Sequence, residues 1–118
     1  MIRLDKDLIL LNKNGEQIPV YIEGDAPPVL PDEYFTVSED STSNAVSADN
    51  KAQAHLYEFT LKYYTKDITR LYTGLNEAIT QLIGKGYDIE GVGYHNGTYQ
   101  DAWRSRAVDV EKIENLED

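Results

Sequence analysis

The chain has 118 residues, a formal net charge of −10 and 41% hydrophobic residues, which suits one folded domain over residues 1–118. The excess of acidic side chains disfavours binding of the folded body to nucleic acid, because it repels the phosphate backbone. The sequence contains no cysteine, which excludes disulfides, thiolate metal sites and cysteine nucleophiles, and no apolar run approaches the roughly 20 residues that span a membrane.

The N-terminal segment admits two interpretations. Leucines at i, i+4 and i+7 favour a short helix over residues 3–13 that would end at Gly15; they are Leu4, Leu8 and Leu11. The alternative is a strand over residues 8–11, followed by a hairpin turn at Asn14-Gly15. The spacing favours the helix, and both interpretations stay open for residues 1–14.

The next segments predict two strands and a long loop. Residues 17–23 alternate apolar and polar side chains, and Pro19 places them at a sheet edge because proline cannot donate to a ladder. A stiff connection follows, with prolines at positions 27, 28 and 31, and leads to a second strand over residues 34–38. Residues 39–52 are small and polar, which predicts a mobile loop.

The central part of the chain has the clearest periodicity. Alternate positions of a strand over residues 53–64 form a set that we expect to face the core: His55, Tyr57, Phe59, Leu61 and Tyr63. Residues 68–83 carry an apolar stripe at helical spacing, made of Ile68, Leu71, Tyr72, Leu75, Ile79, Leu82 and Ile83. Asp67 is suited to cap the start of this helix, and Gly84-Lys85-Gly86 to end it.

The last part of the chain predicts two more strands, over residues 87–94 and 105–113, with a turn at Asn96-Gly97 and a frayed tail over residues 114–118. The whole order predicts an α+β fold. In this two-layer sandwich, a mostly antiparallel sheet of four or five strands packs against one long helix, and a short N-terminal helix is one interpretation of the first residues. An exposed strand edge in such a sheet is a site for pairing with another chain.

The residues that carry chemistry do not form a catalytic or metal-binding pattern. His55 and His95 share no local motif, and His55 falls on the predicted core face, where we expect a structural role. Asp88 and Glu90 lie on one strand face, a spacing that matches no metal motif. We therefore expect no enzymatic activity, no metal and no cofactor; a hydrolase or isomerase that uses His55 with a carboxylate ranks last among the hypotheses.

Side chains suited to protein contacts are more prominent. Nine tyrosines occur against two phenylalanines and one tryptophan, and Tyr and Trp are enriched in protein interfaces. Trp103 lies in a polar connection, where it is either an interface anchor or a lid over the end of the core. The candidate interface residues lie around it and in the polar loop; they are Trp103, Arg104, Arg106, Glu39, Asp40, Asn44 and Asp49.

A recognisable order of elements runs through residues 15–113. It comprises Pro19-Val20-Tyr21 and the proline-rich turn, Tyr34-Phe35-Thr36-Val37 and the polar loop, the strand His55–Tyr64, the helix Ile68–Ile83, and the closing run from Tyr87-Asp88-Ile89-Glu90-Gly91 to Trp103-Arg104-Ser105-Arg106-Ala107-Val108-Asp109-Val110. This order resembles the tail-completion proteins of long-tailed bacteriophages, which include tail terminators and the tail-to-head joining proteins of siphophages. The first 14 residues depart from the family, whose members often begin with a fuller helix.

The resemblance implies a two-layer α+β domain without enzymatic residues or a cofactor. Members assemble as hexameric rings at the head-proximal end of the tail tube, where they stop tube polymerisation and dock the tail to the head. The expected partners are further copies of the chain, the tail-tube protein and the head connector or stopper protein, with no sequence-specific nucleic acid and no membrane. The expected location is the host cytoplasm during assembly, and then the head–tail junction of the virion.

A second hypothesis requires no phage. The chain would be a small acidic adaptor or inhibitor of the host that binds one protein partner through Trp103 and the tyrosine-rich sheet. An acidic body favours a basic partner. Portal, capsid and tail-tube genes beside the gene for this chain would distinguish the first hypothesis from the second.

Overall fold

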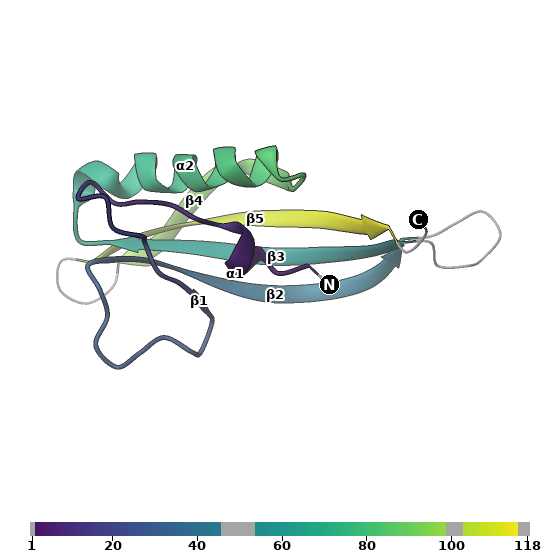
Figure 1. Ribbon diagram of the computed structural model, residues 1–118, viewed down its shortest axis with the longest axis horizontal. Coiled ribbons are helices and arrows are strands. Elements are labelled where there is room, and N and C mark those ends of the chain that lie inside the picture. Colours follow the sequence, from purple (N-terminus) through teal and green to yellow (C-terminus); the bar gives the residue numbers. More distant parts are fainter. Residues whose placement is uncertain (1, 46–53, 99–102, 116–118) are drawn as a thin grey trace.

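The computed structural model describes residues 2–45, 54–98 and 103–115. Five strands form one sheet in the order β1-β2-β3-β5-β4. The strands are β1 (Val20–Ile22), β2 (Glu33–Ala45), β3 (Ala54–Thr65), β4 (Asp88–Thr98) and β5 (Arg104–Asn115), and the helices are α1 (Leu4–Asp7), the 3-10 turn η1 (Ile68–Arg70) and α2 (Leu71–Gly84). Figure 1 shows α2 lying along one face of the sheet. The predicted α+β class with one long helix is confirmed.

The sheet is mixed, which corrects the prediction of a mostly antiparallel one. β1 pairs with β2 in parallel, with Val20 opposite Phe35 and Ile22 opposite Val37. The connection over residues 23–32 carries the chain back to the starting end of β1, so that β2 runs in the same direction. A hairpin turn would have made the pair antiparallel.

A buried cluster lies between α2 and the sheet. From α2 it takes Leu75, Ala78 and Leu82, and from the sheet it takes Phe35, Val37, Tyr57, Phe59, Leu61, Tyr63, Val108 and Val110. The predicted core face of β3 is confirmed from Tyr57 to Tyr63, whereas His55 is only half-buried. Three members of the predicted helical stripe are exposed instead, namely Ile68, Tyr72 and Ile83. The sheet contacts a narrower strip of α2 than the apolar spacing predicts.

The start of the long helix differs slightly from the prediction. Residues 68–70 form the 3-10 turn η1, and the α-helix begins at Leu71. The Asp67 carboxylate accepts a hydrogen bond from the Thr69 backbone N–H at 3.0 Å, which confirms the predicted cap. The helix ends as predicted, since Gly86 has a φ of 90° and its N–H donates to the Ile83 carbonyl.

The predicted loop over residues 39–52 is wrong in its first half. Residues 39–45 continue β2, with Thr42 opposite Tyr57 and Ala45 opposite Ala54. Two hydroxyl groups of this segment donate hydrogen bonds to carboxylates, Ser41 Oγ to Glu58 on β3 and Thr42 Oγ1 to Glu39 along the same strand. A polar strand of this kind pairs through its backbone without an apolar face. Residues 46–52 lie outside the described part of the chain.

The N-terminal segment combines both interpretations. Only Leu4–Asp7 is helical, so the helix predicted over residues 3–13 is mostly wrong. The chain then turns at Gly15, which has a φ of 81°, and Leu11 bridges antiparallel to Gln17. This turn matches the hairpin alternative. Leu4, Leu8 and Ile18 are buried in the main core.

The end of β4 and the C-terminal tail also differ from the predictions. The predicted turn at Asn96-Gly97 lies inside β4, where Gly97 has a φ of 85° and the register with β5 shifts between His95 and Thr98. The glycine therefore makes a bulge rather than ending the strand. Glu114 and Asn115, predicted as tail, belong to β5.

A substitution of Thr36 in β2 tests the burial of polar groups on the sheet face that lies away from α2. Its Oγ1 is buried and has no hydrogen-bond partner among the described residues. We expect Thr36→Val to raise the free energy of unfolding by about 1 kcal/mol, because it removes a buried unsatisfied hydroxyl at nearly constant volume. Thr60→Val is the matched control and should be destabilising, since the Thr60 hydroxyl donates to Asp40. Equal effects in urea unfolding would contradict this expectation.

Candidate protein interface

The strands β2, β3 and β5 continue past the end of α2 (Figure 1). We call this extension the arm and define it as residues 39–45 of β2, 54–58 of β3 and 111–115 of β5. The register within it is regular on the side of β5, from Glu58 opposite Glu111 to Ala54 opposite Asn115. Between β2 and β3 the register shifts at a bulge between Glu39 and Ser41. The arm is thus a paired and twisted ribbon that presents backbone edges to solvent.

An aromatic cluster lies at the opposite end of the sheet from the arm. Tyr34 stacks on Tyr64 with ring centroids 4.7 Å apart, and the Trp103 ring meets the Tyr34 ring edge-on at 5.4 Å. Lys66 Nζ lies 5.0 Å from the centre of the Trp103 ring. Tyr63 faces α2, so its neighbour Tyr64 and the whole cluster lie on the other face of the sheet. Trp103 is half-buried here, which fits both the lid and the interface anchor.

The two predicted arginines make different contacts. The Arg104 guanidinium donates to the Trp103 carbonyl at 3.1 Å. Arg106 lies opposite Tyr63 in the ladder, and its guanidinium carbon is 4.5 Å from the centre of the Tyr72 ring on α2. Arg106 therefore covers the helix side of the sheet, where a cation over an aromatic ring is stabilising.

The predicted acidic residues mark the base of the arm. Glu39 and Asp40 are exposed on β2, where Asp40 accepts hydrogen bonds from Ser38 and Thr60. Asn44 lies opposite His55 near the tip of the arm. Asp49 lies outside the described residues. Glu39, Asp40 and Asn44 therefore belong to a strand of the arm and not to the predicted loop.

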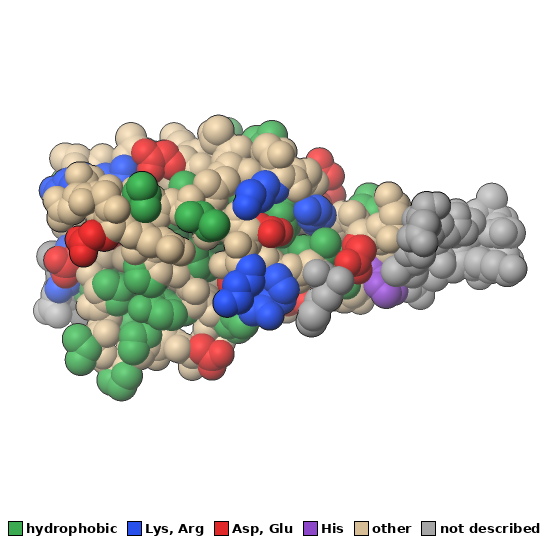
Figure 2. All heavy atoms as spheres, in the orientation of Figure 1, with side chains coloured by type: hydrophobic (Ala, Val, Ile, Leu, Met, Phe, Trp, Pro, Cys, Tyr) green, Lys and Arg blue, Asp and Glu red, His purple; other side chains and the backbone are tan. Residues whose placement is uncertain are grey.

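Exposed apolar side chains form another surface that the sequence did not single out. Figure 2 shows hydrophobic side chains gathered over the segment that joins β1 to β2. Val29 in this segment is 85% exposed, and Ile22 at the end of β1 is 44% exposed. Such a group on one side of a small domain is a candidate for contact with another protein.

A charged network lies at the start of β2. Sequence spacing did not predict it, because its members lie far apart in the chain. Glu33 accepts hydrogen bonds from the Tyr63 hydroxyl and from Arg70 Nε, the latter at 3.1 Å. Arg70 also pairs with Glu77 at 3.2 Å. Burial alone would lower the pKa of Arg70, but its bonds to Glu77 and Glu33 outweigh burial and raise it. The network joins β2 and β3 to the start of α2.

Two buried tyrosines should make stability fall at alkaline pH. Burial and a hydrogen bond to a carboxylate, Glu33 for Tyr63 and Asp7 for Tyr87, raise the pKa of each hydroxyl above its ordinary 10.0. Below pH 10 both the folded and the unfolded chain keep these protons, and stability is complete. Above it, the unfolded chain releases protons that the folded chain retains, so the free energy of unfolding falls as the pH rises.

Urea unfolding at several pH values between about 8 and 11 measures this fall. Tyr63→Phe and Tyr87→Phe should each flatten the pH dependence. The same slope in the wild type and in both buried-site variants would contradict the assignment.

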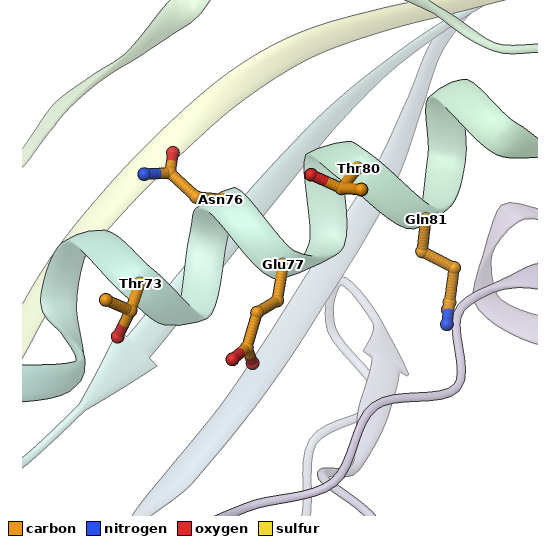
Figure 3. A pocket seen from close by; sticks show the side chains of 5 residues that line it. All are labelled: Thr73, Asn76, Glu77, Thr80 and Gln81. Atoms are coloured by element: carbon orange, nitrogen blue, oxygen red, sulfur yellow. The ribbon is translucent and has the colours of Figure 1, made fainter.

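A hollow on the outer side of α2 does not resemble an active site. It has a volume of about 600 Å³, and its walls are Thr73, Asn76, Glu77, Thr80 and Gln81 on the outer side of the helix (Figure 3). Glu77 is its one charged residue and pairs with Arg70. Gln81 is occupied too, since its side-chain amide donates to the Ile9 carbonyl at 2.8 Å. The hollow offers neutral polar groups for contact and no nucleophile–base pair.

The histidines lie on different strands. His55 is half-buried on the arm opposite Glu114, and His95 is exposed on β4 opposite Arg106. Within residues 2–45, 54–98 and 103–115, no group of three or more His, Asp or Glu side chains could hold a metal ion. No helix in this part of the chain is long and apolar enough to cross a membrane.

Comparisons with known proteins add no family to this geometry. No protein-family model matches the chain. No curated protein matches it significantly. The candidate interface thus stands on the described residues alone.

Proposed function

We propose that this chain is a structural protein of a tailed bacteriophage, which terminates the tail tube or joins the tail to the head by forming a ring. The observation that carries the proposal is the arm, a ribbon of three strands that extends past the helix and leaves backbone edges open to other chains. The order of elements supports it through the resemblance to tail-completion proteins. We take α2 and the sheet as the two layers of a sandwich that carries the arm.

The surfaces of the chain suit a closed ring. A ring needs two unlike surfaces on each copy, so that the front of one copy meets the back of the next. The chain has a polar outer side of α2 and, on the other side of the sheet, the half-buried Trp103, which meets the buried Tyr34 ring edge-on. The partners of such a ring are the tail-tube protein on one side and the head connector or stopper protein on the other.

The net charge of −10 is compatible with a ring through which DNA passes. A wall with the same charge sign as the phosphates does not hold the passing polymer. No sequence-specific contact with DNA is needed for this role. The charge also favours partners with basic surfaces.

Electron microscopy and genetics test the proposal. We expect concentrated protein, or protein bound to tails, to appear as rings of six copies. A phage that lacks the protein should make tails of abnormal length or tails that do not join heads. Normal tails joined to heads in the absence of the protein would overturn the proposal.

One observation favours the alternative of a host adaptor or inhibitor. Trp103 is half-buried between Lys66 and the buried Tyr34 ring, which it meets edge-on, so the surface of this residue stays partly accessible. An adaptor would bind one partner through this surface. Trp103→Ala should then abolish capture of a single non-phage protein, whereas a tail protein would be captured from phage-infected cells.

A further inference from the structure

The outer edge of β2 is only partly covered. β1 lies beside Phe35 to Val37, where the Phe35 N–H donates to the Pro19 carbonyl and the Val37 carbonyl accepts from the Glu23 N–H, both at 2.9 Å. Backbone groups on one side of a strand repeat every second residue. The backbone of Glu39 therefore faces the same edge, but β1 ends before it and no strand among the described residues lies there.

A hollow of about 310 Å³ opens beside this uncovered edge. Ile22 at the end of β1 and the buried Val37 and Phe59 form its apolar walls, and Glu39 and residues 2–5 around α1 complete it. Ile22 is opposite Val37, and both face the hollow. By the same alternation, a residue paired opposite Glu39 would direct its side chain to this face and into the hollow.

The edge is negatively charged. Glu39 and Asp40 are exposed, and hydroxyl groups of Thr42, Ser38 and Thr60 donate to them. Neither carboxylate has an ion-pair partner in the described part of the chain, and the nearby Arg3 is paired with Asp5 at 2.8 Å. A cation beside this edge would therefore meet an attractive field.

We propose that the uncovered edge of β2 binds an extended segment of a partner protein, in which an apolar residue flanked by Lys or Arg fills the hollow. The backbone of the segment would pair with β2 at Glu39, just before the bulge between Glu39 and Ser41, and extend the sheet in line with β1. This inference deepens the proposed assembly function, and it rests on that function for the identity of the partner as another virion protein.

A second copy of the chain is a poorer occupant. The other edge strand of the sheet is β4, which carries the exposed residues Asp88 and Glu90. Its ladder is interrupted between Glu90 and Tyr94, where Gly91 and Gly93 have positive φ. Like charges and an irregular backbone both disfavour pairing of β4 with the acidic edge of β2.

Peptide binding tests the inference on the full chain. The probe is a fluorescent peptide of about eight residues that alternates Val and Lys. We expect its fluorescence anisotropy to rise with protein concentration, and the amide signal of Glu39 and the methyl signals of Ile22 and Val37 to shift in NMR spectra. A Val–Glu peptide should not bind, and neither should a Val–Lys peptide with N-methylated backbone, because it cannot complete the ladder.

Charge variants supply the matched comparison. The double variant Glu39→Lys, Asp40→Lys should weaken binding of the Val–Lys peptide at least about tenfold, whereas Glu16→Lys, at an exposed turn outside the edge, should change it less than about twofold. Equal binding of the N-methylated peptide, or NMR shifts confined to other surfaces, would overturn the inference. Dimers of the chain would also overturn the inference if Glu39→Pro abolishes them and the N-methylated peptide does not, because a second copy would then occupy the edge.

The same variants separate this inference from the proposed function. If the chain forms rings while the Val–Lys peptide fails to bind, the edge inference is wrong and the ring role stands. If the peptide binds at the edge while no rings form and phage tails are normal without the protein, the ring role is wrong and the edge inference stands.

Discussion

Replacing Gly74 by alanine should lower the free energy of unfolding by about 2–3 kcal/mol, although the same change usually stabilises a helix. Gly74 lies in α2 directly against the Tyr63 ring, and a Cβ atom added at this position would come within 2.7 Å of Tyr63 Cε2. Tyr63 is fully buried and its ring also packs against Phe35 at 4.8 Å, so it has no room to withdraw. The cost of overpacking therefore exceeds the gain in helix propensity.

Gly84 is the matched control for this prediction. It is the last residue of α2, and an added Cβ would meet nothing within 4 Å. Gly84→Ala should therefore raise the free energy of unfolding by up to about 1 kcal/mol. Urea unfolding followed by circular dichroism compares the two variants, and a Gly74→Ala protein as stable as the wild type would show that α2 does not approach β3 so closely.

Replacing Arg70 by methionine should cost about 2 kcal/mol, the second large effect. The Arg70 side chain is 15% exposed and pairs with Glu33, which is 13% exposed, at 3.0 Å. Without the guanidinium, Glu33 keeps the Tyr63 hydroxyl as a donor but loses its cation in a largely dry environment. The loss is smaller than for a fully buried pair, because water still reaches part of both side chains.

Two further variants show whether burial causes this loss. Glu77, the other partner of Arg70, is 48% exposed, so Glu77→Gln should destabilise the fold much less than Arg70→Met. Lys13→Met removes a pair with Asp67 in which the lysine is 71% exposed, and it should have little effect. Similar losses of unfolding free energy in all three variants would mean that Glu33 is as well solvated as a surface carboxylate.

The sequence patterns of β3 and α2 predicted the structure of these two elements well. In β3 the alternation of Tyr57, Phe59, Leu61 and Tyr63 matches the pleat of a strand with one buried face, and the structure buries this set. The α2 segment combines a cap at Asp67, helical apolar spacing and a terminal glycine, and each of these signals acts within a few residues. Local sequence patterns predict the structure correctly where they favour the same conformation as the tertiary packing.

The arm shows why local patterns fail at other positions. Residues 39–45 lack the apolar alternation that marks a strand, because this part of β2 has no core to cover. What holds it in the sheet is its backbone pairing with β3 and hydroxyl contacts such as Ser41 with Glu58. These partners are distant in the sequence, so composition alone predicted a loop.

The sequence by itself determined the α+β class, the long helix, the central strand and the acidic character of the chain. Only the tertiary structure decided that β1 joins in parallel, that Glu33 meets Arg70, and that β2 has an uncovered edge beside an apolar hollow. The physical reason is the range of the interactions. Helix caps and apolar periods act between near neighbours, whereas strand direction, ion pairs and hollows depend on which distant segments the folded chain brings together.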